Sequence, residues 1–220
     1  MKTSLSALAC ILLSTVALWA DTVIVQKVEA PGQSGEMTLK VRDHLIRIDI
    51  TPEVSTIMDT KSGDITTIMH TQKAYMNIPA SAAMKMFEAM QGQQAKATPA
   101  PKPELKPTGQ KETINGHETE IYTLESGEMK SRFWIAKAYP NAKAILETFK
   151  RINESPMSKM AKEMAHQPSD FPGVPVKTEI TVSPDQKVTS TLISVEEKDL
   201  PATEFSVPEG FNAIEMPTPQ

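Results

Sequence analysis

The sequence predicts an α+β fold, in which a single strongly curved antiparallel sheet carries helices over its concave face. Three observations lead to this prediction. Strand patterns dominate the chain, short turn signals separate most of them, and helical patterns occur in only two interruptions. Short turns join antiparallel neighbours, whereas parallel strands need long crossovers. Helices that are grouped in this way pack together on one side of a sheet.

Residues 1–20 have the pattern of a secretory signal peptide. Lys2 supplies a positive start, Leu5 to Trp19 is apolar and uncharged, and Ala20 is a small residue before the expected cut. The apolar run is about 15 residues long, which is short for a membrane span of about 20. We therefore expect export to the periplasm or the medium, with residues 21–220 forming one domain.

Cys10 is the only cysteine in the chain. We place it within the signal peptide and do not expect lipoprotein anchoring there, because only the short segment Leu5 to Ala9 would precede the cut. The mature chain would then lack disulfides and thiolate metal sites. Without Lys2 the chain has 22 basic and 27 acidic residues. This balance is unlike that of a nucleic-acid-binding surface, so we expect no nucleic-acid partner.

The first half of the predicted sheet has one clear apolar face. Residues alternate with period two, which marks a strand with one buried side, and this puts three isoleucines together: Ile46, Ile48 and Ile50. Arg47 lies on the opposite side, as does Arg42 relative to Leu39 and Val41. We expect both arginines to point to solvent. The segment Lys61–Asp64 is a hairpin turn candidate.

A helix is expected at about residues 80–91, with an apolar stripe that includes Met84, Phe87 and Met90. An exposed proline-rich linker at about residues 92–108 follows it, because its four prolines are compatible with neither a helix nor a central strand. We expect this linker to lie within one domain, since the later strands are needed to complete the sheet.

The second half continues the sheet and adds two helices. Asn115-Gly116 is a strong hairpin signal, because both residues tolerate positive φ. Pro140 starts a helix with Ile145 and Phe149 on one face. Ser155-Pro156 starts a short second helix, whose apolar face carries three methionines: Met157, Met160 and Met164. Alternating strand patterns resume from Val176.

No catalytic motif is present. The sequence has no G-x-S-x-G segment, and no nucleophile is marked beside His44, His70, His117 or His166. We place His70 in a strand. The alternation along His117–Glu120 points possible ligands to opposite faces of a strand, so they could not share one metal ion. We therefore expect neither an enzyme nor a bound cofactor or metal.

Several segments resemble an uncharacterised family of exported bacterial proteins, a domain of unknown function (DUF4412): "GDITTIMHTQKAYMNIP", "PTGQKETINGHETEIY", "FWIAKAYP" and "DFPGVPVKTE". That family is in turn similar to the periplasmic lipoprotein carriers LolA and LolB. The resemblance implies a LolA-like half-barrel with an apolar hollow. The carriers use an arginine on a strand that faces the cavity, whereas Arg47 lies opposite the isoleucines, which weighs against lipoprotein transport.

These features favour a non-enzymatic binding protein that holds an acyl chain, lipid or peptide, with membrane contact only during ligand exchange. Two alternatives remain open: an envelope structural or interaction module with a filled core, and a copper-binding protein that uses methionine thioethers. The expected apolar-ligand cavity would be lined by Ile46, Ile48, Ile50, Met84, Phe87, Met90, Phe149, Met157, Met160 and Met164.

Overall fold

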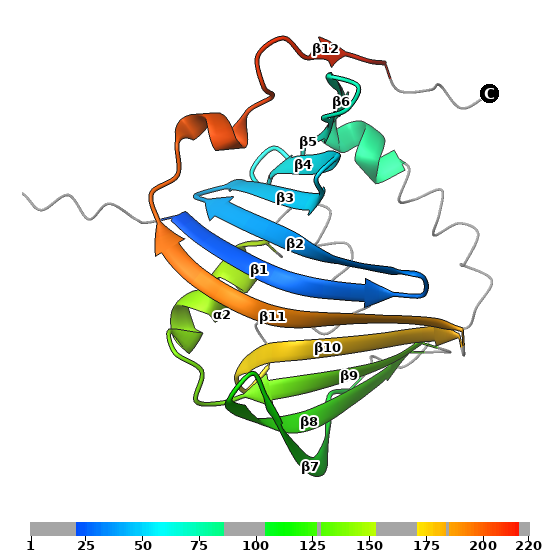
Figure 1. The fold of residues 1–220 in the computed structure, drawn as a ribbon, viewed down its shortest axis with the longest axis vertical. Helices are drawn as coiled ribbons and strands as arrows, with labels where there is room; N and C mark the ends of the chain where they lie inside the picture. Colours follow the sequence, from blue (N-terminus) through cyan, green and yellow to red (C-terminus); the bar gives the residue numbers. More distant parts are fainter. Residues whose placement is uncertain (1–20, 86–103, 127–128, 153–170, 184, 216–220) are drawn as a thin grey trace, which may run out of the picture.

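A computed structural model describes residues 21–85, 104–126, 129–152, 171–183 and 185–215. These residues form one large curved sheet of twelve strands, which is antiparallel except at one edge (Figure 1). Its strand order is β12-β6-β5-β4-β3-β2-β1-β11-β10-β9-β8-β7, so β12 and β7 are its two edges and the sheet does not close. The prediction of one curved antiparallel sheet is confirmed.

The elements follow one another along the chain with few helices between them. Six strands come first: β1 (Asp21–Ala30), β2 (Gln33–Arg42), β3 (Leu45–Thr51), β4 (Val54–Asp59), β5 (Ile65–Met69) and β6 (Ala74–Ile78). Residues 80–85 are helical. The rest comprises β7 (Lys106–Ile114), β8 (His117–Ser126), β9 (Met129–Ala136), helix α2 (Ala142–Ile152), β10 (Val174–Ser183), β11 (Gln186–Lys198), the 3-10 turn η2 (Ala202–Phe205) and β12 (Asn212–Ala213).

The tight turns lie where the sequence places them. Asn115 and Gly116 have φ values of 49° and 81° and join β7 to β8. Residues 60–64 join β4 to β5, with Gly63 at φ 86°. Both connections need positive φ, which Gly and Asn adopt at low cost. Pro107 lies in β7, where an edge strand tolerates its missing N–H.

One face of β1–β4 carries the predicted isoleucines, and we call it the isoleucine face. Residues directly opposite each other in neighbouring strands share a face, and Ile24 pairs with Leu39, which pairs with Ile48. Ile24 and Ile46 are fully buried on this face, whereas Ile50 is 48% exposed. The apolar surface is therefore packed in the middle of β3 and open at its end.

Helix α2 packs on the isoleucine face, behind β1 and β11 in Figure 1. Ile145 and Phe149 of α2 join a buried cluster with strand residues that include Ile24, Val174 and Leu192. The apolar stripe thus marks a real helix, but this helix begins at Ala142 and not at Pro140, because Asn141 has a φ of 54°. The prediction that helices cover the concave face stays a prediction. Among the described residues, no helix is long and apolar enough to span a bilayer.

The C-terminal segment, residues 199–214, runs past β2–β6. Leu200 N–H donates to Asp21, and Phe205 is buried with the Arg42 guanidinium 5.0 Å from its ring centre. Further on, Asn212 and Ile214 N–H groups bond to β6, which forms the short parallel pair. This segment contacts the face opposite the isoleucines, which we call the polar face.

Candidate functional site

A groove of about 520 Å³ lies at the open end of the isoleucine face. The β1–β2 hairpin forms one wall through Val28, Met37 and residues 32–36, and Ile50 at the end of β3 forms the other. Its volume lies within the range of about 300–1,000 Å³ that is typical of small-molecule pockets. The groove is the described feature that best fits an apolar guest.

The predicted cavity residues fall into two groups. The three isoleucines share one face: Ile46, Ile48 and Ile50. Met84 is half-buried within the helical residues 80–85. Phe149 is buried on the side of α2 that packs against the sheet. Only Ile50 lines the groove. The remaining predicted residues lie outside the described part of the chain: Phe87, Met90, Met157, Met160 and Met164. The predicted methionine-rich cover therefore stays a prediction.

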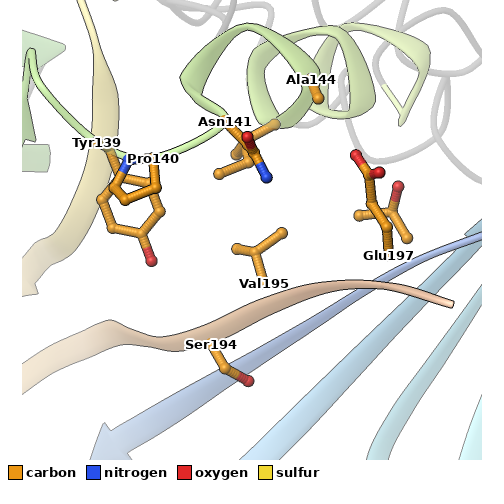
Figure 2. A pocket seen from close by; sticks show the side chains of 9 residues that line it. Tyr139, Pro140, Asn141, Ala144, Ser194, Val195 and Glu197 are labelled. Carbon is orange, nitrogen blue, oxygen red and sulfur yellow. The ribbon is translucent and has the colours of Figure 1, made fainter.

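A second cavity, of about 310 Å³, lies between the start of α2 and strands β1 and β11 (Figure 2). Its apolar walls come from the Pro140 ring and from Ala144, Ile145 and Val195. Val195 points from β11 toward the helix. The α2 end thus rests on the sheet through a few apolar contacts and leaves space beside them.

Polar side chains also line this cavity: Thr22, Tyr139, Asn141 and Glu197. Ser194 borders it too, but its hydroxyl points away from α2 (Figure 2). Thr22 pairs with Glu197 across β1 and β11, so both side chains project from one face of the sheet. Tyr139 also stacks at a tilt against His117, with ring centres 4.5 Å apart. Burial raises the pKa of the Tyr139 phenol. Sequence reasoning missed this group, because its members come from three separate segments.

The polar face holds a compact charged cluster under the C-terminal segment. Asp49 accepts from Lys40 Nζ at 2.9 Å and from Arg47 Nε at 2.6 Å. Lys40 also binds the Glu204 carboxylate at 2.7 Å, and Arg47 donates to the Glu204 carbonyl oxygen at 3.1 Å. The Arg47 side chain is only 11% exposed.

The expectation that Arg42 and Arg47 point to solvent was wrong. Both lie opposite the isoleucines, as the alternation indicated, but the C-terminal segment covers that face. Arg42 forms a two-point contact with Asp21, through Nε at 2.8 Å and Nη2 at 2.6 Å, and also donates to the Leu200 carbonyl. Strand alternation fixes the face of a side chain but not what packs on that face.

His70 also differs from its prediction. It follows the end of β5 instead of lying within it, and its Nε2 is 2.8 Å from Ser55 Oγ. No local pattern near His70 indicates this neighbour, because the contact crosses the β4–β5 hairpin. Ser55 is 1% exposed and donates its hydroxyl proton to Asp49 Oδ1 at 2.7 Å.

The hydrogen bonds at Ser55 do not mark it as a nucleophile. Its hydroxyl donates to Asp49 Oδ1, and Arg47 Nη2 donates to its oxygen at 3.0 Å, so the one proton of this hydroxyl is directed at Asp49 and not at His70. A general base would need the opposite arrangement, with the histidine accepting from the serine. Ser55 and His70 therefore link β4 to the end of β5 as structural partners.

In this cluster, hydrogen bonds offset the effect of burial on the charged side chains. Burial alone would raise the pKa of Asp49, but hydrogen bonds from Lys40, Ser55 and Arg47 outweigh it and hold that pKa below its usual value. Burial alone would lower the pKa of Lys40, but its hydrogen bonds to Glu204 and Asp49 outweigh burial, so the net shift of that pKa is upward. Both groups are ionised at neutral pH.

The described chain thus belongs to the class of proteins built on one unclosed, curved antiparallel sheet with few helices. Residues 22–211 match the family model of the Domain of unknown function (DUF4412), and the chain belongs to that family. This confirms the family resemblance of the sequence. No curated protein matches this chain.

Solved structures show distant similarity. The chain is 12% and 10% identical to two structures of PNGF-II, with TM-scores of 0.40 and 0.41. Each alignment covers 90% of this chain, which spans about a third of PNGF-II, at 31% and 32%. A DUF1329 family protein from Desulfovibrio piger is 8% identical at a TM-score of 0.33, with 86% of this chain and 91% of that chain covered.

Proposed function

We propose that this protein is an exported, non-enzymatic binding protein that holds an apolar ligand on the isoleucine face. The ligand class is an acyl chain, a lipid or an apolar peptide. The groove at the end of that face carries the proposal, because it combines a volume of about 520 Å³ with a large apolar side chain left 48% exposed at Ile50. Membrane contact would be limited to loading and release of the ligand.

The lining chemistry supports an apolar guest. Val28, Met37 and Ile50 offer side-chain surface, and Met37 can adapt its shape to different occupants. An exposed apolar patch beside a concave wall is typical of interaction sites. The non-enzymatic part of the proposal is supported by the hydrogen bonding at Ser55, which leaves His70 without the role of a base.

Native mass spectrometry of protein purified from the periplasm tests this proposal. We expect a bound apolar molecule, and we expect added fatty acid to raise the melting temperature. Ile50→Asp places a charge in the groove and should abolish both effects. Ile193→Asp is the matched control, because Ile193 is 46% exposed on β11 but does not line the groove.

The opposite result would be protein without any bound apolar molecule and with an unchanged melting temperature. It would favour the alternative of an envelope structural or interaction module. One observation already favours that alternative: Ile24 and Ile46, in the middle of the face, are 0% and 1% exposed, so part of the hollow is filled core. The copper-binding alternative depends on Met157 and Met160, outside the described residues, and is tested by copper titration of their leucine variants.

A further inference from the structure

The cavity beside α2 is lined by a buried hydroxyl that has no partner among the described residues. Thr22 is 7% exposed, and its side chain makes no hydrogen bond within the described part of the chain. Buried polar groups in folded proteins nearly always have a protein or water partner. A buried, unpaired hydroxyl is costly, so its presence at the wall of a cavity calls for an occupant that bonds to it.

The other polar groups around this cavity are similarly uncommitted. Tyr139, Asn141 and Glu197 make no side-chain hydrogen bond to the described residues. Figure 2 shows the Asn141 amide and the Glu197 carboxylate pointing into the space between α2 and β11, whereas the Ser194 hydroxyl points away from the helix. Two hydroxyls, one amide and one carboxylate therefore surround a single cavity, and none of them has a partner among the described residues.

The composition of the wall defines the ligand. Two of the polar groups are hydroxyls and one is an amide, so most of them both donate and accept hydrogen bonds. The described lining carries one carboxylate and no basic side chain, which disfavours an anion. A cation would find a single charged partner, Glu197, and would leave the donors of Asn141 and Tyr139 unused.

We infer that this cavity binds a small neutral polyol, such as a monosaccharide or a sugar alcohol. The hydroxyls of such a ligand can donate to and accept from the polar groups of the cavity. Its C–H faces can pack against the apolar side chains of Pro140, Ile145 and Val195. The volume of about 310 Å³ is at the lower end for ligand pockets and so fits one small unit. The raised pKa of Tyr139 keeps its phenol neutral and able to donate.

This site is separate from the proposed apolar groove. Thr22 lies at the start of β1, whereas Val28 of the groove lies near its end. The two proposals can therefore fail independently, and fatty acid serves as a control that should not compete with a polyol.

Calorimetric titration of the full mature chain with glucose, galactose, mannose and mannitol tests the inference. We expect one molecule of at least one of them to bind per chain. Thr22→Val removes only the hydroxyl and should weaken binding roughly tenfold. Thr191→Val, on β11 outside the cavity, should bind as the unaltered protein does. Ala144→Leu fills the cavity from an exposed helix position and should abolish binding.

A second measurement separates a ligand role from a structural one. Because the Thr22 hydroxyl has no partner among the residues that the structure describes, Thr22→Val should leave the melting temperature unchanged or raise it. A clear fall would show that the hydroxyl stabilises the fold, and would overturn the inference. It would also be overturned if none of the four polyols bound, if Thr22→Val and Thr191→Val bound equally well, or if the diamine putrescine bound more tightly than every polyol.

Discussion

Replacement of Asp49 by Asn tests the charged cluster on the polar face. The Asp49 carboxylate accepts from Arg47 at 2.6 Å, from Ser55 at 2.7 Å and from Lys40 at 2.9 Å. Asparagine has the same shape but only one acceptor oxygen, so its amide N–H₂ must face at least one of these donors. The substitution therefore breaks the cluster without creating a cavity.

The expected loss follows from the contacts and their exposure. A hydrogen bond to a charged group contributes about 1.5–3 kcal/mol, and removing one partner of a buried ion pair costs about 3–5 kcal/mol. Two features reduce the loss: the Asp49 side chain is 25% exposed, and Lys40 keeps its bond to Glu204. We expect Asp49→Asn to lower the free energy of unfolding by about 3 kcal/mol at pH 7.

The effect should depend on pH with a definite sign. The pKa of Asp49 is lowered in the folded protein, so its contribution is present above its unfolded pKa of about 3.9 and is lost as the pH falls through the folded value. Urea denaturation of both proteins should therefore give a large difference at pH 7 that narrows below about pH 4. A stability difference that narrows as the pH falls comes from the Asp49 charge, because a packing defect would remain at low pH.

The control is Asp185→Asn, in the exposed β10–β11 turn. We expect a change within about 0.5 kcal/mol for this variant. Two results would refute the claim that the Asp49 charge stabilises the fold. One is a loss in the free energy of unfolding for Asp49→Asn as small as that for Asp185→Asn, and the other is a loss that is the same at pH 3 and pH 7.

Two further substitutions test packing, with thermal or urea denaturation as the measurement. Phe205→Ala should lower the free energy of unfolding by about 3 kcal/mol, since this ring is 8% exposed and anchors the C-terminal segment. The control is Ser206→Ala at the adjacent exposed position, which should lower it far less. Equal losses for the two variants would contradict the anchoring role of Phe205. Gly173→Ala should cost about 1–3 kcal/mol, because a Cβ there would lie 2.5 Å from the Ala136 carbonyl oxygen. Gly35→Ala, where a Cβ meets nothing within 4 Å, is the control, and a harmless Gly173→Ala would contradict this close approach.

Local patterns in the sequence predicted the local structure well. The Asn115-Gly116 turn, the alternation along β3 and the apolar stripe of α2 all depend on residues within a few positions of each other, and all appear in the structure. In each case a single physical preference decides the outcome: positive φ, period two, or the repeat of apolar residues along one helix face.

Contacts between distant segments could not be predicted in the same way. Arg47 and Glu204 are 157 positions apart, and nothing near either residue indicates that they meet. The polyol cavity has the same origin, since Thr22, Asn141 and Glu197 come together only through β1–β11 pairing and the placement of α2.

The pairing of β1 with β11 also determines the order in which the sheet can assemble. Strands β1–β6 pair with their neighbours in sequence, as do β7–β11, so each half can form from strands that are adjacent in the chain. Strand pairing joins the two halves through Asp21–Glu29 and Thr189–Lys198. Closing such a long loop is slow compared with forming a hairpin. Until residue 198 has been synthesised, β1 has an unpaired edge, and this exposed edge is where premature association between nascent chains would begin.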